Sequence, residues 1–220
     1  MSGLAREPVA LLLAAGKGSR LGADKPFVDV GGRPLLERAL RPFRKSAHVE
    51  DVLIVVGPDA TPRFEHLRTP RIHIVENPDP EGGMITSIRI GLQNSWSAER
   101  NFLICPADLP YIKPEMVDRI VRMFLTRGVR IVLPAYRGLG GHPGMFDNSL
   151  RDDFFMHGDQ HGAREVIRRH MDDTARLNVE DPDICFDIDT PEDLAIATDA
   201  GARWARIEAE VEARKKMRYR

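Results

Sequence analysis

The chain has little of three things that would narrow its class at once: cysteine, aromatic residues and net charge. Its 220 residues include 2 cysteines, 6% are aromatic, and the formal net charge is −1. Cys105 and Cys185 lie at no metal-ligand spacing, so we expect buried, reduced thiols in a cytoplasmic protein. The balance of 32 Lys and Arg against 33 Asp and Glu gives no global basic field of the kind that attracts nucleic acid or an anionic membrane.

Long apolar runs are also missing. The longest span about five to seven residues, far short of the roughly 20 that cross a bilayer. The N-terminal MSGLAREPVALLLAAG has no apolar stretch followed by a small-residue cleavage site, so we expect no signal peptide. A chain of this length is expected to form one domain over residues 1–220, with 198–220 as a C-terminal helical extension.

Short apolar runs alternate with amphipathic segments along the chain. The runs are typical of strands covered on both faces: VALLLA (9–14), VLIVV (52–56), IHIV (72–75), NFLIC (101–105), RIVLPA (130–135) and ICFDI (184–188). Apolar residues at three- and four-residue spacing predict helices over 33–43, 84–96, 114–127 and 163–170. This alternation predicts an α/β fold with a mostly parallel sheet, whose ligands bind beyond the carboxyl ends of the strands.

The first run leads into a glycine-rich loop, LLLAAGKGSRLGADK, at residues 11–25. Its GKGSRLG spacing is one residue longer than that of a dinucleotide fold, and no acidic residue ends a second strand about twenty residues later, where the ribose partner would lie. It is not a Walker loop, since Lys17 is followed by Gly18. The alternatives are an ordinary surface turn and a loop whose backbone N–H groups approach an anion, with Arg20 and Lys25 as cations beside it. The preceding strand and the cations favour a phosphate-binding loop.

Carboxylates follow two of the later apolar runs. Asp108 comes just past NFLICP, and Asp187 and Asp189 lie at the end of ICFDI, where alternation puts both on one face. A carboxylate just past a buried parallel strand lies on the binding rim. Magnesium prefers one or two carboxylates together with phosphate oxygens and water. These residues are therefore candidates for a metal site, and helix capping around Thr190 is the competing role for the second pair.

The stretch over residues 12–40, which contains LAAGKGSRLGADKPFVDVGGRPLLERAL, resembles the L-A-[AG]-G-x-[GS]-x-R-[ML]-G-x-x-K signature of nucleotidyltransferases of the molybdenum cofactor type. The resemblance extends over 9–197 and implies a Rossmann-like three-layer sandwich of the nucleotide-diphospho-sugar transferase type. It implies a base slot against Ala14–Gly16, a triphosphate contact from Arg20 and a phosphate contact near the transferred centre from Lys25. The nucleotide contacts implied in this stretch are Leu13, Ala14, Ala15, Gly16, Gly18, Arg20 and Lys25.

Two further stretches resemble the cytidylyltransferase branch of these enzymes. EGGMITSIRIGLQ, at 81–93, is similar to a G-M-x-x-S-[IL]-x-x-G-[IL] element that contacts the nucleotide, which implies such contacts from Gly83 and Ser87. GLGGHPGMF, at 138–146, is similar to a G-H-P element that lines the acceptor pocket, which implies an acceptor contact from His142.

The same resemblance bears on the metal. The metal aspartate of the family matches Asp108, with Ala107 where relatives commonly have Gly, and the second ligand matches Asp189 best. Asp187 is the second choice for the metal and an alternative acceptor contact. GDQHGAREVIRRH, at 158–170, is similar to a G-D-x-G-A-R element but is one residue longer, so its Asp has no assigned role.

These features predict Mg²⁺-dependent nucleotidyl transfer, with Arg20, Lys25 and Asp108 as the catalytic set: an acceptor phosphate attacks the α-phosphorus in line and pyrophosphate leaves. Position 15 is commonly Gly in guanylyl-transferring relatives, and the methyl group of Ala15 narrows the base slot and favours a pyrimidine. The first hypothesis is therefore CMP transfer from CTP, with GTP as the alternative nucleotide, to a molybdopterin-type acceptor in a pathway that serves a molybdenum hydroxylase. The alternatives are transfer to a sugar phosphate or other small phospho-alcohol, and a non-catalytic nucleotide-binding chaperone for the cofactor.

Overall fold

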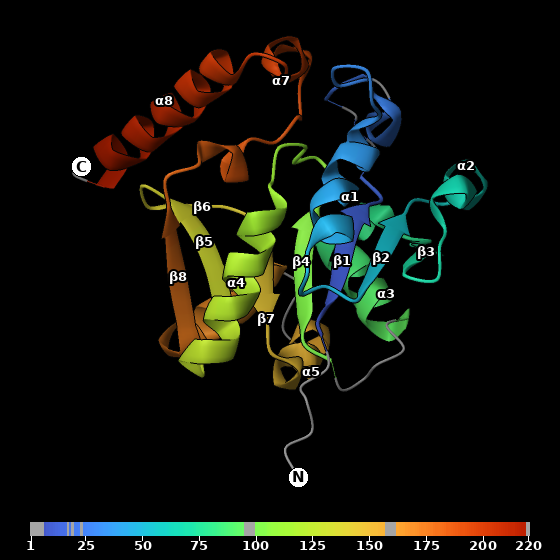
Figure 1. Ribbon diagram of the computed structural model, residues 1–220, viewed down its shortest axis with the longest axis horizontal. Coiled ribbons are helices and arrows are strands. Elements are labelled where there is room, and N and C mark those ends of the chain that lie inside the picture. Colours follow the sequence, from blue (N-terminus) through green and yellow to red (C-terminus); the bar gives the residue numbers. More distant parts are fainter. Residues whose placement is uncertain are drawn as a thin grey trace.

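The computed structural model describes residues 7–16, 18, 20–22, 24–94, 100–156 and 162–218. They contain an 8-stranded sheet in the order β3-β2-β1-β4-β7-β5-β6, and β8 pairs with β5 outside this path (Figure 1). The strands are β1 Val9–Ala14, β2 Asp51–Val56, β3 Ile72–Glu76, β4 Phe102–Pro106, β5 Ile131–Tyr136, β6 Leu139–Gly140, β7 Gly144–Phe146 and β8 Thr174–Val179.

The sheet is mostly parallel but has an antiparallel strand at its centre. β1 pairs with β2 and β4, β2 with β3, and β5 with β8, all in parallel. β7 lies between β4 and β5 and is antiparallel to both, and β6 forms a hairpin with β5. The carboxyl ends of β1 and β4 therefore lie at the same edge of the sheet, where a ligand site is expected.

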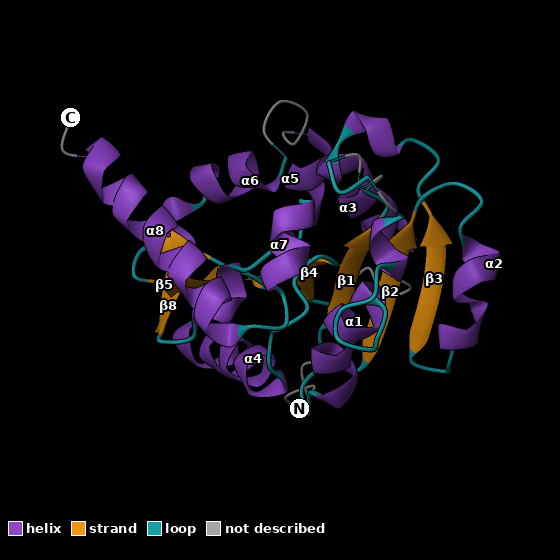
Figure 2. Cartoon of the chain, turned by 90° about the horizontal axis from the view of Figure 1, so that it is seen from above, coloured by secondary structure: helices purple, strands orange, loops and turns teal. Residues whose placement is uncertain are grey.

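Helices cover both faces of the sheet and make three layers (Figure 2). The helices are α1 Leu35–Lys45, α2 Thr61–Phe64, α3 Met84–Asn94, α4 Pro114–Arg127, α5 Arg151–Met156, α6 Ala163–Arg169, α7 Pro191–Ile196 and α8 Ala200–Arg218. α1 and α4 lie on one face, and α3, α5 and α6 on the other.

The continuous apolar run of β1 follows from this double cover. Leu12 is fully buried in the core on the side of α1 and α4, and its neighbour Leu11 is fully buried in the second core, on the side of α3 and α5. Each such side chain contributes about 1.5–3 kcal/mol by leaving water. The predicted three-layer α/β fold is confirmed.

One predicted strand is wrong. The run over 184–188 forms no strand: a 3₁₀ turn spans Pro182–Cys185, and the residues after it are extended without ladder pairing. Phe186 and Ile188 are buried, which produces the strand-like alternation, but the Ile188 N–H donates singly to the Asp108 carbonyl oxygen (3.0 Å). β5 is already paired with β6, β7 and β8, so this run does not join it.

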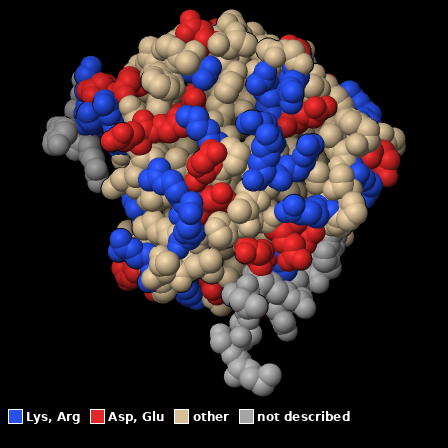
Figure 3. Space-filling view, viewed as in Figure 1, with Lys and Arg blue, Asp and Glu red and all other residues tan. Residues whose placement is uncertain are grey.

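α8 lies across the carboxyl-end edge of the sheet, above β5, β6 and β8 (Figure 1). Ile207 and Val211 bury its apolar face in the core. No helix in the described part of the chain is long and apolar enough to span a bilayer. Basic and acidic side chains are intermingled over the face seen in Figure 3, in keeping with the small net charge.

Candidate active site

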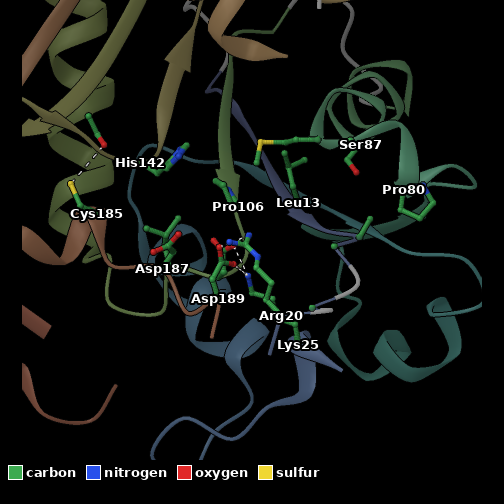
Figure 4. Close-up of a pocket in the computed structure, with 18 of the residues that line it drawn as sticks. Leu13, Arg20, Lys25, Pro80, Ser87, Pro106, His142, Cys185, Asp187 and Asp189 are labelled. Atoms are coloured by element: carbon green, nitrogen blue, oxygen red, sulfur yellow. Dashed lines mark hydrogen bonds and ion pairs between the residues drawn. The ribbon is translucent and has the colours of Figure 1, made fainter. Parts of the chain in front are cut away.

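A cleft of about 550 Å³ lies beyond the carboxyl ends of β1 and β4. Most of the residues singled out from the sequence line it: Leu13, Ala15, Gly16, Gly18, Arg20, Lys25, Gly83, Ser87, Asp108, His142, Asp187 and Asp189. Figure 4 shows two sides of this cleft, one with Ser87 and Pro80 and the other with His142 and Cys185, with the aspartates between them. Residues from Leu13 to Asp189, far apart in the sequence, thus meet in one site.

An ionic network fills the centre of the cleft. Lys25 Nζ lies 2.8 Å from Asp108 Oδ2 and 2.5 Å from Asp189 Oδ1, and an Arg20 Nη lies 2.7 Å from Asp189 Oδ2. Burial lowers the pKa of Lys25, but the charges and hydrogen bonds of Asp108 and Asp189 outweigh it and raise this pKa above 10.5. Burial raises the pKa of Asp189, but Lys25 and Arg20 bring it below 3.8. Lys25 and Asp189 are therefore both charged at neutral pH.

The glycine loop determines where the two cations lie. Gly18 and Gly22 have φ values of +60° and +68°, which suit glycine, and the N–H groups of Leu21 and Gly22 donate to the Gly18 carbonyl. Leu21 is buried and fixes the turn against the core. Arg20 projects from this turn with 73% of its side chain exposed, whereas Lys25 is 13% exposed. Lys25 is held beside the carboxylates, whereas Arg20, which pairs with Asp189, is mostly exposed.

The acidic side of the cleft comes from the extended segment before α7. Thr190 caps α7 in a capping box with Asp193, and Asp193 Oδ2 also accepts from the N–H of Asp189 (3.0 Å). The predicted cap is confirmed, and it orients the backbone of Asp189. Asp187 lies nearby: burial and the charges of Asp108 and Asp189 raise its pKa above 3.8.

The donor set suits a hard cation that arrives with a ligand. Among the described residues, no three His, Cys, Asp or Glu side chains are grouped closely enough to hold a metal. Asp108 and Asp189 each place one oxygen against Lys25 Nζ, so two carboxylate oxygens face the same small space. Magnesium uses this arrangement when substrate phosphates and water complete its coordination. The residues therefore fit a metal that is shared with a phosphate group.

Asn77, which the sequence reasoning missed, organises the opposite side. This buried amide accepts from the Asp79 N–H (2.9 Å) through Oδ1 and donates through Nδ2 to the hydroxyls of Thr86 (2.8 Å) and Ser87 (2.9 Å). Since the Ser87 oxygen accepts this bond, its own proton can be donated into the cleft. Gly83 precedes α3 with φ +85° and leaves open space where a Cβ would lie. The Asn-Pro-Asp-Pro sequence that starts at Asn77 is a turn signal that could have drawn attention to it.

His142 and Cys185 line the side of the cleft remote from α3 (Figure 4). Burial lowers the pKa of His142 to about 4, although Asp187 and a hydrogen bond to the Ile104 backbone oppose this, so the ring is neutral at pH 7. Burial raises the pKa of the Cys185 thiol to about 12. Both cysteines are free, and Cys185 is half-buried, not buried as expected.

α8 also reaches this side: Glu210 and Arg214 line the cleft. Their positions on a long polar helix gave no signal in the sequence, because helical spacing reveals the apolar face and not what the polar face meets.

A second cavity of about 550 Å³ adjoins the first across the glycine loop. Ala14, the one predicted nucleotide contact outside the first cleft, lines it together with Phe27 and Arg63. The Arg63 guanidinium lies 3.5 Å from the centre of the Phe27 ring. Lys17 and the Asp and His of the 158–161 segment lie outside the described residues.

Comparison with known proteins agrees with this geometry. The chain is 36% identical over 138 residues to the 2-C-methyl-D-erythritol 4-phosphate cytidylyltransferase of Corynebacterium efficiens, covering 57% of this chain and 54% of that protein. It is 26% identical over 129 residues to a probable molybdenum cofactor guanylyltransferase of Thermococcus sibiricus, covering 59% and 62%. The aligned part thus spans only about half to three-fifths of the length of these curated relatives.

The fold has close counterparts among solved structures. The 4-diphosphocytidyl-2C-methyl-D-erythritol synthase of Anaerococcus prevotii superposes with a TM-score of 0.72 at 17% identity, covering 88% of this chain and 95% of that one. The molybdopterin-guanine dinucleotide biosynthesis protein A of Archaeoglobus fulgidus superposes with a TM-score of 0.66 at 19% identity, covering 89% and 99%. At such identities the likeness concerns the fold.

The match to a family is direct. The MobA-like NTP transferase domain matches residues 10–174, which include the glycine loop, the strand before Asp108 and the Gly-His-Pro segment at His142. The chain therefore belongs to the MobA-like NTP transferase domain family of nucleotidyltransferases.

Proposed function

We propose that the protein transfers CMP from CTP to a phosphorylated acceptor of the molybdopterin type and releases pyrophosphate. The observation that carries this proposal is the network of Arg20, Lys25, Asp108 and Asp189, set between a nucleotide side and an opposite side of one cleft. Arg20, Lys25 and Asp108 are the proposed catalytic residues. An acceptor phosphate is largely ionised at neutral pH, so transfer needs no dedicated base.

The two cations change partners when a triphosphate binds. Its oxygens compete with Asp108 and Asp189 for Lys25, and Arg20 swings from Asp189 to the phosphates. Lys25 then stabilises the charge that develops on the α-phosphoryl group, while its low exposure limits competition from water. Asp108 and Asp189, released from the cations, would hold Mg²⁺, which would neutralise charge on the reacting phosphates.

The nucleotide side supports a pyrimidine. The buried methyl group of Ala15 narrows the slot beside the loop. Ser87, held as an acceptor by Asn77, offers a proton to the base, and cytosine has acceptors at O2 and N3. GTP is the alternative nucleotide, since guanine also carries acceptors and one relative is a guanylyltransferase.

The acceptor is proposed to lie against His142, whose neutral ring uses its N–H on the Ile104 backbone and offers its other nitrogen as a hydrogen-bond acceptor. Asp187 is the alternative contact. A second candidate acceptor is a small phospho-alcohol, favoured by the 36% identity to a 2-C-methyl-D-erythritol 4-phosphate cytidylyltransferase.

The first test is thermal unfolding with CTP, GTP, UTP, ATP and NAD, each with and without Mg²⁺. A ligand that binds only the folded state stabilises it by about 2.7 kcal/mol at a hundred times its dissociation constant. We expect a Mg²⁺-dependent shift that is largest with CTP. A larger shift with GTP would overturn the base assignment, and no shift with any triphosphate would contradict the proposed activity.

Pyrophosphate release then identifies the acceptor. Molybdopterin, 2-C-methyl-D-erythritol 4-phosphate and a hexose 1-phosphate are compared at equal concentration with the preferred triphosphate. We expect release with molybdopterin. Release with 2-C-methyl-D-erythritol 4-phosphate alone would establish the second candidate, and triphosphate binding without release from any acceptor would favour a nucleotide-binding chaperone.

A further inference from the structure

We propose that α8 is part of the catalytic unit and that its Arg206 is the positioning residue for the carboxylates of the cleft. The inference rests on the proposed function and goes beyond it, because it gives a role to a helix outside the matched family segment, 10–174. Arg206 itself does not line the cleft.

Arg206 bridges the two acids that flank Asp189. Its Nη atoms lie 3.3 Å from Asp187 Oδ1, and Nη1 also donates to the Asp187 carbonyl oxygen (3.2 Å). Its Nε lies 3.3 Å from Asp193 Oδ1. The other oxygen of Asp193 accepts from the N–H groups of Asp189 (3.0 Å) and Thr190 (2.9 Å).

Through these bonds one guanidinium contacts the carboxylates of Asp187 and Asp193 and the backbone at Asp187. The planar fork of Arg reaches three oxygen atoms in a fixed geometry, which a Lys ammonium reproduces only in part. Asp187 is held by side chain and main chain, and Asp189 is held through the acid that caps α7. Partners of this kind, one bond removed from a ligand, typically change metal affinity or activity 10–100-fold when they are lost.

A different residue anchors α8, so the loss of Arg206 can be tested without unfolding the helix. Arg203, 6% exposed, makes a bidentate pair with Asp183 and donates to the Ala197 carbonyl. Arg206 is 34% exposed, and both of its acid partners lie on the segment that leads into and begins α7. Loss of Arg206 should therefore loosen the carboxylates and leave α8 in place.

Further along, the same helix lines the cleft with Glu210 and Arg214. α8 thus touches the site twice: it supports the carboxylates from behind and forms part of the wall beside Cys185. This double contact is what we expect of a helix built into the active site rather than appended to it.

The test compares Arg206→Met and Arg206→Lys with Lys215→Met, an exposed Lys on the same helix that pairs with Glu212. Mn²⁺ affinity is measured by electron paramagnetic resonance in the presence of CTP and, separately, of GTP. The ligand-free melting temperature and kcat are measured alongside. We expect Arg206→Met to weaken Mn²⁺ binding 10–100-fold, Arg206→Lys to restore part of it, and Lys215→Met to change nothing, with all melting temperatures within a few degrees of the wild type.

The outcomes separate the two proposals. If the wild type binds no Mn²⁺ with either triphosphate, the proposed function fails. If the wild type binds and Arg206→Met binds equally well, the positioning role is overturned and the proposed function stands. An equal loss in the Met and Lys variants, or a fall in melting temperature that accounts for the lost binding, also overturns the positioning role.

Discussion

Two ionic clusters in the described part of the molecule, one beneath α8 and one in the cleft, are built differently. Beneath α8, Asp183 and Arg203 are both nearly inaccessible, joined by two bonds of 3.1 and 3.2 Å, and the guanidinium lies 3.7 Å from the centre of the Tyr111 ring. In the cleft, Lys25 serves two acids, Asp108 and Asp189, each of which is 22% exposed.

The difference lies in how completely each charge is matched. The Asp183 cluster is closed, since one acid faces one cation and Trp204 donates a further bond to the acid. The Lys25 cluster is open: its acids outnumber its buried cation, and Asp187 adds a third carboxylate nearby. A closed pair is suited to holding an element in place, and an open one to exchanging partners with a ligand.

Breaking the closed pair should give the largest effect. Arg203→Met leaves Asp183 buried without its cation, so we expect unfolding to require about 3–5 kcal/mol less free energy. Urea denaturation measures this. Lys113→Met is the control, because its pair with Asp181 involves a Lys that is 58% exposed and should contribute less than about 1 kcal/mol. Similar losses of unfolding free energy in both variants would show that burial of the Asp183–Arg203 pair does not increase its contribution to stability.

Breaking the open cluster should cost activity and not stability. Asp108→Asn keeps the shape of the side chain and removes one of three neighbouring carboxylates, so the melting temperature should hold or rise. Turnover, followed as pyrophosphate release, should fall roughly a hundredfold, as for other preorganised charges. Lys25→Met should lower turnover to a similar degree. Wild-type turnover in Asp108→Asn would contradict both the catalytic and the metal assignment.

The neutral hydrogen bonds of the nucleotide side should show a smaller effect. Ser87→Ala removes one hydroxyl, so we expect triphosphate affinity to fall up to about tenfold. Calorimetric titration with CTP and ATP measures the change, and the loss should be greater for CTP because the slot narrowed by Ala15 is proposed to admit the smaller base to Ser87. An equal loss for both nucleotides would place Ser87 away from the base.

A last expected effect is the pH response of His142. Burial lowers the pKa of His142 to about 4 in the folded protein. Between about pH 6.5 and pH 4, His142 is therefore protonated in the unfolded chain and neutral in the folded protein. The contribution of His142 to stability therefore falls as the pH is lowered through this window. Melting temperatures of the wild type and His142→Gln at pH 7 and pH 5 should differ in this sense. A wild type that gains stability relative to the variant at pH 5 would reverse the sign.

Much of the fold could be predicted because buried positions are occupied by apolar residues, whose spacing is visible in the sequence. The β1 run is continuously apolar because both faces of its sheet are covered, and the helix over 114–127 has apolar residues at helical spacing because one side packs on that sheet. The structure has both elements at the predicted bounds. β8, with TARLNV, was missed because its residues are mostly half-buried or exposed and form no apolar run. β6 and β7 are too short to produce a pattern.

The site followed the same logic in part. Glycines, Arg20 and Lys25 were conspicuous because they cluster after a strand, and the aspartates because each ends an apolar run. The pairing of Lys25 with Asp189 could not be foreseen, since 164 residues separate them and only the sheet topology brings them together. For the same reason no pattern in the sequence indicated Arg206: the role of an Arg on a polar helix face depends on the residues that it contacts in the folded chain.

The position of β7 has a mechanical consequence. In the described part of the chain, β7 alone forms hydrogen bonds both to β4 and to β5. Gly144–Phe146 therefore joins two halves of the sheet, one with β1 to β4 and the other with β5, β6 and β8. Phe146 stacks on Phe102 of β4 and meets Phe154 of α5 edge-on, which stiffens the seam. One half carries the glycine loop and Asp108, and His142 stands directly before the seam. Three residues thus join the two halves, and in the proposed reaction they would set how rigidly the nucleotide and the acceptor are held in line.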